Sequence, residues 1–153
     1  MYREYGGLVY RRAWRMLGDR QEAEAALQEV VGRLLGKIGS YDERAKIQNY
    51  LFRITTNYCL DQIKSQRRRP KLHEYRPEIT EGGTNPEREA AGREMLKLAL
   101  EQSDARVARI GWLYHIDGMT QERISEVMEL SRRTIGKLLK QFRREARQQV
   151  KNE

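Results

Sequence analysis

The residues best suited to chemistry are basic side chains in the C-terminal part of the chain. In residues 120–145, four cations recur every three or four residues, so a helix would carry them on one face. They are Arg133, Lys137, Lys140 and Arg144. A short helix, a tight turn and a longer basic helix is the arrangement that places one helix in the major groove of DNA. A helix that is only solvated usually alternates Glu with Lys, and this one does not. The segment therefore predicts DNA binding.

The position of each polar side chain along that helix predicts what it contacts. The first two turns are expected to read base edges, because arginine can bind guanine through two hydrogen bonds. Lys140 and Arg144 lie later and are expected to bind phosphates. Free backbone N–H groups at the helix N-terminus also favour phosphate. The predicted DNA-reading residues are Ser131, Arg132, Arg133, Thr134, Lys137, Lys140, Gln141 and Arg144.

A second polar row lies on a predicted helix in the first half of the chain, which runs into the basic residues 67–69. Its members are Arg53, Asn57, Asp61, Lys64 and Arg68. Asparagine is suited to base edges and arginine to phosphates, whereas Asp61 is equally suited to a bridge within the helix. Tyr41 precedes this helix and is suited to stack on an unpaired base or, as readily, to pin its loop onto the core.

Composition excludes several classes of protein. The 153 residues carry a net charge of +8, which favours a polyanionic partner, nucleic acid first and an acidic membrane surface second. With 34% charged and 39% hydrophobic residues, thin helical layers are expected rather than one thick core. Cys59 is the single cysteine, so no intramolecular disulfide can form. No apolar run approaches the ~18 residues of a membrane span and no secretory signal is present, so a cytoplasmic protein is expected.

Catalytic motifs are absent from the sequence. It contains no GxGxxG, Walker, HExxH or GxSxG motif and no Cys/His group with zinc spacing. Its two histidines offer little imidazole chemistry. We therefore expect no enzyme activity, no cofactor and no metal.

Three helices are predicted in the first part of the chain. The first ends at Gly18, the second begins at the capping-box pair Asp19 and Glu22 and ends at Gly39, and the third follows a cap at Ser40. Their stripes are Tyr10, Ala13, Trp14 and Leu17; Leu27, Val30, Val31 and Leu34; and Ile47, Leu51, Ile54 and Tyr58. The chain begins inside the first helix, so an N-terminal leader is expected to be absent or trimmed.

Proline and glycine separate this part from a second helical part. Residues 72–85 lack helical periodicity and are predicted to form a flexible linker, and Asn85 followed by Pro86 predicts a new helix start. The prediction is an all-α protein of two small helical domains, residues 1–71 and 86–153.

The second part contains its own turn and cap signals. Asp117 and Gly118 predict a turn, Thr120 and Ser131 predict helix N-caps, and Glu129 lies in the connection between the last two helices. The expected inward-facing residues are Val107, Ile110, Leu113 and Tyr114; Ile124, Val127 and Met128; and Ile135, Leu138, Leu139 and Phe142.

Two long blocks of the sequence resemble a known family. Region 2 of extracytoplasmic-function sigma factors, the smallest members of the sigma-70 family, is similar to residues 5–35 (YGGLVYRRAWRMLGDRQEAEAALQEVVGRLL) and 49–69 (NYLFRITTNYCLDQIKSQRRR). Their region 4 is similar to residues 117–142 (DGMTQERISEVMELSRRTIGKLLKQF). The resemblance implies a bacterial initiation factor that binds core RNA polymerase and directs it to promoters.

The resemblance also implies roles for particular residues. The second helix is expected to dock on the clamp helices of the largest polymerase subunit, although Ala25 stands where relatives usually have aspartate. The expected polymerase contacts are Glu24, Leu27, Gln28 and Glu29. The −10 element is expected to be captured, as an extruded base, by Tyr41, Arg53, Asn57, Asp61, Lys64, Arg67 and Arg68. Region 4 is expected to read the −35 element and to rest on the polymerase flap, an anti-sigma factor is an expected partner, and the free protein is expected to be a monomer.

Three further positions depart from the family pattern. Tyr50 replaces a common tryptophan, and Ser125 replaces a frequent alanine. Glu129 occupies a turn position that is often glycine, which is tolerable if its backbone is not left-handed.

Two other functions are weighed against the sigma factor. The helix-turn-helix alone fits a self-sufficient repressor, which would dimerise on a palindrome. A nuclease built around Asp61 and Glu24 is improbable, because two lone carboxylates lack metal-ligand spacing.

Overall fold

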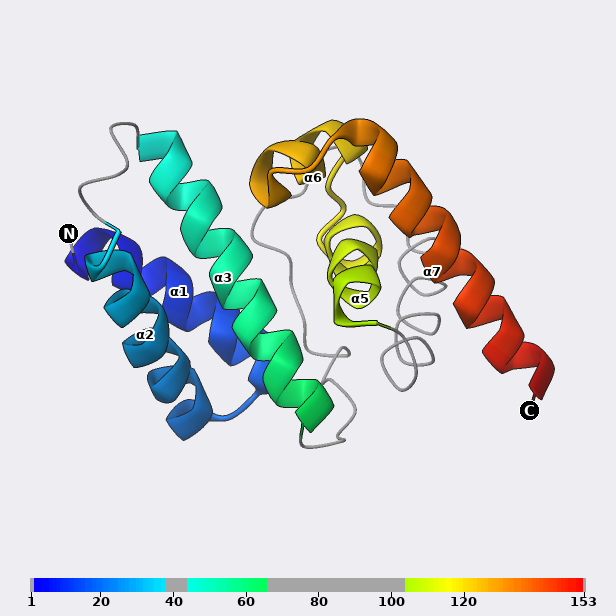
Figure 1. The fold of residues 1–153 in the computed structure, drawn as a ribbon. Helices are drawn as coiled ribbons and strands as arrows, with labels where there is room; N and C mark the ends of the chain where they lie inside the picture. The colour runs from blue at the N-terminus through cyan, green and yellow to red at the C-terminus, as the bar shows by residue number, and fades with distance from the viewer. Residues whose placement is uncertain (1, 38–43, 66–103, 153) are drawn as a thin grey trace. The chain divides into compact units, whose positions relative to one another are not determined.

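The computed structural model describes residues 2–37, 44–65 and 104–152, and every element within these ranges is a helix (Figure 1). The predicted all-α class is confirmed. The chain divides into two compact units, of which the first contains three helices as far as Ile63. The predicted linker 72–85 and the predicted helix start at Asn85 lie outside the described residues. The helices are α1 (Tyr2–Leu17), α2 (Arg20–Leu35), α3 (Arg44–Ser65), α5 (Ala105–Gly111), the π-helix η3 (Trp112–Ile116), α6 (Gln121–Met128) and α7 (Arg132–Asn152).

A tight connection joins α1 to α2. Gly18 has a φ of 68°, in the left-handed region that glycine accepts without strain. Its N–H donates to the carbonyl oxygen of Trp14 at 2.7 Å. Asp19 then caps α2, because its Oδ1 accepts a hydrogen bond from the N–H of Glu22 at 2.9 Å. Both predicted boundaries are confirmed, and α1 and α2 lie side by side (Figure 1).

The core of the first unit is shared by its three helices. Aliphatic and tyrosine side chains from α1, α2 and α3 meet in one buried cluster, so each helix is held by the other two. The cluster consists of Tyr5, Val9, Val30, Leu34, Tyr50, Leu51 and Ile54, with Leu8, Leu27 and Ile47 packed against it.

A buried arginine fastens α1 to α3. Arg12 is 1% exposed, and its Nε donates to Oγ1 of Thr56 at 2.9 Å. Its guanidinium carbon also lies 3.8 Å from the centre of the Phe52 ring. A buried cation is costly unless its donors and its charge are used, and here the hydroxyl and the aromatic face use both. The contact fixes which side of α3 faces α1 and therefore which side faces away.

The stripe predicted for α1 is only half correct. Ala13 and Leu17 are buried, but Tyr10 is half-buried and Trp14 is 46% exposed. Two overlapping stripes in this helix satisfy helical spacing, and the packed one is richer in small and aliphatic side chains. Its members are Tyr5, Val9, Arg12, Ala13, Met16 and Leu17.

The end of α2 also differs from the prediction. The helix stops at Leu35 with Gly36 as its C-cap, whereas the sequence suggested Gly39, which lies outside the described residues. Leu34 is the last buried side chain of α2.

The described part of the second unit begins with a capped α-helix that continues into a π-helix. The carboxylate of Asp104 accepts a hydrogen bond from the N–H of Arg106 at 2.7 Å and starts α5, which continues into η3. The chain turns at Gly118, whose φ is 69°. Thr120 then caps α6, because its Oγ1 accepts from the N–H of Arg123 at 3.0 Å. The predicted turn and the predicted cap are confirmed.

The close approach of α7 to α5 depends on a glycine. A Cβ added to Gly111 would lie 2.4 Å from Cε2 of Phe142, closer than packed atoms can come. The ring of Phe142 therefore occupies the space that any other residue at position 111 would fill, and it is fully buried there. Gly136 is a contrasting case, since the nearest atom to a Cβ added there would be Oε1 of Gln121, at 3.8 Å.

The turn between α6 and α7 contradicts one expectation. Glu129 has φ 55° and ψ 42°, so its backbone is left-handed, which a residue with a Cβ adopts at a cost. Hydrogen bonds on both sides hold it there. The N–H of Leu130 donates to the Ser125 carbonyl at 3.2 Å, and the Ser125 hydroxyl donates to the Leu130 carbonyl at 2.6 Å. The two hydrogen bonds between Ser125 and Leu130 thus close the turn in which Glu129 has a left-handed backbone.

None of the helices in the described ranges combines the length and the apolarity that crossing a bilayer requires.

The glycine contact predicts opposite effects for two identical substitutions. Gly111→Ala should lower the free energy of unfolding by about 1–3 kcal/mol, because Phe142 must move out of its site. Gly136→Ala should raise it by about 0.5–1 kcal/mol, because alanine loses less backbone entropy in a helix. Urea denaturation of both variants measures the two changes. Equal effects would show that Phe142 does not fill the space above Gly111.

The left-handed turn predicts that a substitution will stabilise the protein. Glu129→Gly should raise the free energy of unfolding by up to about 1 kcal/mol, since glycine adopts this conformation without steric cost. The matched control is Glu126→Gly within α6, which should lower it by about 1 kcal/mol. Thermal melting followed by circular dichroism compares the pair, and a Glu129→Gly variant that melts below the parent chain would contradict the assignment of strain.

Candidate nucleic-acid interface

Helix α7 presents two chemically different faces. Ser131 caps it, because Oγ of Ser131 accepts a hydrogen bond from the N–H of Thr134 at 3.1 Å. One face packs against α5 and α6, so the opposite face must be solvated. The predicted stripe is confirmed and extends by one turn. Its buried residues are Ile135, Leu138, Leu139, Phe142 and Ala146.

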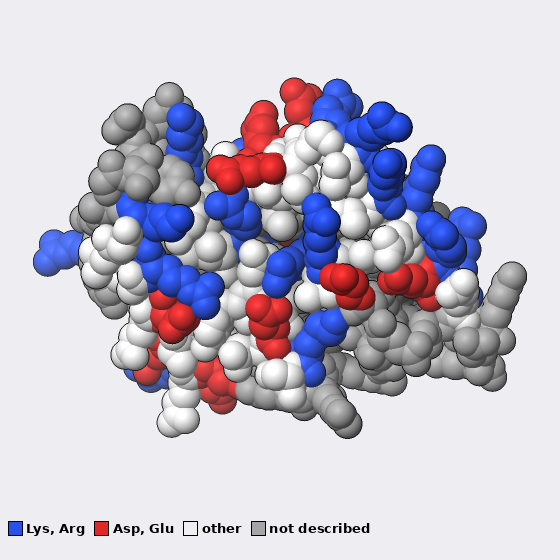
Figure 2. Space-filling model, viewed as in Figure 1, with Lys and Arg blue, Asp and Glu red and all other residues white. Residues whose placement is uncertain are grey.

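The solvated face of α7 is cationic along its described length. Figure 2 shows blue side chains gathered over this helix. The exposed cations are Arg132, Arg133, Lys137, Lys140, Arg144 and Arg147. Towards the C-terminal end, some of them surround a hollow of about 440 Å³ on the helix surface. Its lining residues are Lys140, Arg143, Arg144, Arg147 and Gln148. Such a surface attracts the phosphates of a nucleic acid.

Three of the polar side chains on α7 have internal contacts. The hydroxyls of Ser131 and Thr134 lie 2.9 Å apart, and the former already caps the helix. Gln141 is half-buried, and its Nε2 donates to Oε1 of Glu145 at 3.0 Å. In the first two turns, the side chains that extend furthest into solvent are therefore those of Arg132, Arg133 and Lys137.

The polar row predicted on α3 is present in part. Arg53, Asn57 and Lys64 are half-buried, whereas Asp61 is exposed. The guanidinium of Arg53 lies 5.6 Å from the centre of the Tyr50 ring, a cation–π distance. In the described part of the chain, the buried Oδ1 of Asn57 accepts no hydrogen bond, so its amide has hydrogen-bonding capacity to spare. The remaining members of the predicted set, Tyr41, Arg67 and Arg68, lie outside the described residues.

Helix α2 carries a charged outer surface. Glu24 and Glu29 are exposed and pair with Arg20 and Arg33 at 3.4 and 3.0 Å, while Gln28 is exposed as well. Exposed pairs of this kind contribute little to stability, so both carboxylates can exchange their partners for those of another protein. Leu27 belongs mainly to the core, against which it packs.

A tyrosine of α3 lies close to this charged side of α2. Burial raises the pKa of the Tyr58 hydroxyl above its usual value, and Cys59 and the carboxylate of Glu29 raise it further. The hydroxyl therefore stays protonated at neutral pH beside the charges of α2.

Two exposed apolar residues were missed by the sequence analysis. Leu35 is 60% exposed at the end of α2, and Trp14 is 46% exposed on α1. Leu35 follows the buried Leu34, and side chains of consecutive helical residues point in different directions, so Leu35 lies off the centre of the stripe that ends at Leu34. Nothing in the local pattern distinguishes Trp14 from a core tryptophan.

Within the described ranges, no three His, Cys, Asp or Glu side chains lie close enough together to hold a metal ion.

Comparison with known proteins identifies the first unit. Residues 1–69 match the family model of sigma-70 region 2. The ECF RNA polymerase sigma factor SigW of Bacillus subtilis is 36% identical over 63 residues, which cover 41% of this chain and 34% of SigW. The ECF RNA polymerase sigma factor SigE of Mycolicibacterium smegmatis is 32% identical over 68 residues, which cover 44% of this chain and 26% of SigE.

These alignments span only about a third and a quarter of the two relatives. They nevertheless agree with the region 2 match and with the all-helical fold of the described residues. Residues 1–69 are thus similar to sigma-70 region 2, and both relatives are extracytoplasmic-function sigma factors.

Proposed function

We propose that this protein is a sigma factor, which directs core RNA polymerase to specific promoters and initiates DNA-templated transcription. One combination carries the proposal: a region 2 sequence in residues 1–69 precedes a helix-turn-helix whose second helix is apolar inside and cationic outside. We assign region 4 to residues 86–153 and the flexible tether to residues 72–85. The protein acts in the cytoplasm, as a monomer before it joins the polymerase.

Helix α7 reads the −35 element in this proposal. Its first two turns present Arg132, Arg133 and Lys137 to base edges, where each bidentate arginine–guanine pair contributes about 1–3 kcal/mol of discrimination. Lys140 and Arg144 hold phosphates, which fix the register without reading sequence. The N-caps supplied by Thr120 and Ser131 support this role, because they set where α6 and α7 begin.

Region 2 captures the −10 element. Asn57 has an amide with spare hydrogen-bonding capacity, and Arg53, Asp61 and Lys64 lie on the same helix. Together with Tyr41, Arg67 and Arg68 they receive a base extruded from the non-template strand. Trapping an unstacked base shifts the opening equilibrium of the duplex, so no reacting group and no enzyme activity is required of the chain.

The outer surface of α2 binds the polymerase. Glu24, Gln28 and Glu29 face solvent, and Leu27 supports them from below. These residues dock on the clamp helices of the largest subunit, while region 4 rests on the flap. The same surfaces suit an anti-sigma factor, which would act by covering them.

The presence of region 2 also argues against the alternative function, a self-sufficient repressor. A repressor that reads a palindrome needs a dimer and a helix-turn-helix, and it has no use for a polymerase-binding module. The sigma-70 region 2 match accounts for residues 1–69, which the repressor leaves unexplained.

Charge reversal on α7 tests the DNA face. Arg133→Glu with Lys137→Glu should reduce promoter-specific transcription at least about tenfold, because two base contacts are lost and phosphates are repelled. Run-off transcription with core polymerase measures the loss, and co-purification measures polymerase binding, which should persist.

The control for charge reversal is Arg106→Glu. It makes the same charge change as Lys137→Glu does alone, at an exposed position of α5. It should leave promoter selection within about twofold of the parent chain. Normal transcription by the double variant would show that the DNA face lies elsewhere on the protein.

The substitution at position 25 tests the polymerase face. Ala25 is exposed on α2, and Ala25→Asp should tighten binding to core polymerase about fivefold to tenfold by restoring a charge-assisted contact. Ala25→Asn is the control, since it has the same size and no charge. Affinity is measured by titrating core polymerase against labelled protein, and equal affinities of the two variants and the parent would place this residue off the interface.

A further inference from the structure

Two aromatic side chains on α1 form an exposed pair outside every surface assigned above. The rings of Tyr10 and Trp14 lie nearly parallel, with centroids 6.5 Å apart and an angle of 21° between their planes. Trp14 is 46% exposed, although an indole is among the side chains that gain most from burial. An exposed aromatic pair of this kind is typical of a surface that binds a partner.

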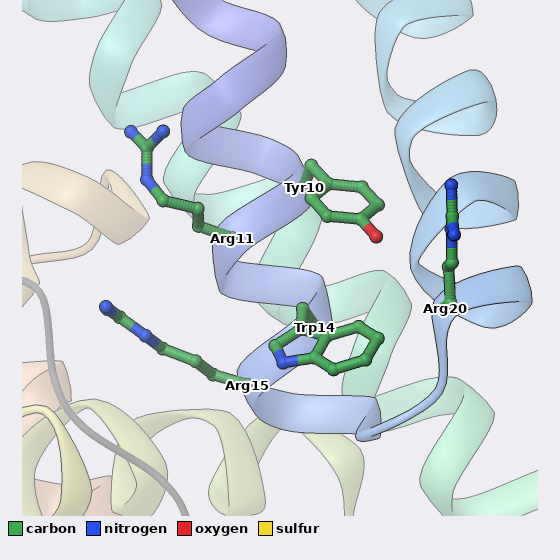
Figure 3. A pocket seen from close by; sticks show the side chains of 5 residues that line it. All are labelled: Tyr10, Arg11, Trp14, Arg15 and Arg20. Atoms are coloured by element: carbon green, nitrogen blue, oxygen red, sulfur yellow. The ribbon is translucent and has the colours of Figure 1, made fainter.

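Three arginines line a hollow next to the aromatic pair. A hollow of about 410 Å³ is lined by Tyr10, Arg11, Trp14, Arg15 and Arg20. In Figure 3 the two rings extend from α1 towards Arg20 on α2, while Arg11 and Arg15 extend from the other side of α1. Among the residues that the structure describes, the lining contains three guanidinium groups and no carboxylate. Its volume is within the range of pockets that bind small organic groups.

The chemistry of the lining specifies its occupant. A flat aromatic surface binds another planar π-system by stacking, and flanking guanidinium groups bind phosphate through paired N–H donors. A nucleotide supplies both partners, a planar base and an anionic phosphate. An acidic peptide would satisfy the arginines and leave the rings without a planar partner.

The arginine nearest the aromatic rings can be recruited at little cost. Nε of Arg20 lies 3.4 Å from Oε1 of Glu24, but both side chains are largely exposed, at 78% and 52%. Such an exposed pair contributes little free energy, so Arg20 can exchange the carboxylate for a phosphate.

We propose that the Tyr10–Trp14 pair, with Arg11, Arg15 and Arg20, is a second nucleotide-binding site, occupied by a base and phosphate of single-stranded DNA. The choice of single-stranded DNA as the occupant rests on the proposed function, because an opened promoter exposes a single strand. A free nucleotide offers the same chemistry, and the experiment must separate the two sources.

The chain carries its own reporter for this site. Of the two tryptophans, Trp112 is fully buried in the second unit and Trp14 is exposed. Titrating the full-length protein with a single-stranded DNA of about 12 nucleotides should therefore quench the Trp14 emission, since a stacked base quenches an indole. The Trp14→Phe variant should lose this quenching.

Substitutions test the stacking and the charge separately. Trp14→Ala should weaken single-strand binding, measured by anisotropy of a labelled strand, about tenfold, whereas Trp14→Phe keeps a ring and should weaken it less than about threefold. Arg11→Ala should reduce the salt dependence by about 0.7 in the log–log slope. Arg3→Ala removes the same charge from an exposed position of α1 that does not line the hollow, and it should change the affinity less than Arg11→Ala does. Circular dichroism checks that each variant keeps its helices.

Competition separates the possible occupants. A nucleoside monophosphate that quenches Trp14 as tightly as the strand would support the nucleotide site and assign it to a free nucleotide. Poly-glutamate that competes as strongly as the strand would overturn the proposal in favour of an acidic protein. Equal affinity of the Trp14→Ala and parent chains for single-stranded DNA would also overturn it.

This outcome is separate from that of the proposed function. A chain that initiates at specific promoters, yet shows no quenching of Trp14 by single-stranded DNA, retains the sigma factor assignment and loses this site. A chain whose Trp14 emission is quenched by single-stranded DNA, yet which directs no specific transcription, retains this site and loses the sigma factor assignment.

Discussion

The packing of α7 on one side only is the constraint on which the second unit depends. Phe142 reaches the backbone of α5 because Gly111 has no Cβ, and this contact sets the rotation of α7 about its axis. Once that face is buried, Arg133 and Lys137 must point into solvent. The position of the helix start follows from local hydrogen bonds, which Ser131 provides. The cationic surface that we propose reads DNA thus arises from the apolar packing of α7 against α5 and α6.

The first unit uses a different interaction for the same purpose. The buried guanidinium of Arg12 contacts the hydroxyl of Thr56 and the ring of Phe52, and these contacts hold α3 against α1. The polar row from Arg53 to Lys64 is thereby turned away from α1. In the proposed function each unit reads one promoter element weakly, and attachment of both to one polymerase raises their effective concentration at the promoter.

Local signals in the sequence correctly predicted the starts of α2, α6 and α7 and the apolar stripe of α7, whereas the predicted cap at Ser40 lies outside the described residues. A cap such as Asp19 or Thr120 depends on atoms within four residues, and the α7 stripe contrasts strongly with its charged face. The exposure of Trp14 could not be predicted, because α1 has two overlapping apolar stripes and only tertiary packing selects one. The left-handed backbone of Glu129 had a signal in the sequence, because this turn position is often glycine in the family that the chain resembles, but only the structure shows that Glu129 adopts it.

Some features of the candidate site could likewise be predicted from the sequence, and others needed the structure. The exposure of the α7 cations could be read from periodicity, whereas the engagement of Gln141 with Glu145 needed the structure. Tyr41, Arg67 and Arg68 stay predictions, as do the tether and the polymerase contacts.

Transcription of genomic promoter fragments by core polymerase, with and without the unmodified chain, tests the central claim most directly. The account predicts specific start sites that appear only when the chain is added and that share two sequence elements at a fixed spacing. Absence of any specific transcript at every salt concentration, together with tight binding of the chain alone to a palindrome, would contradict it.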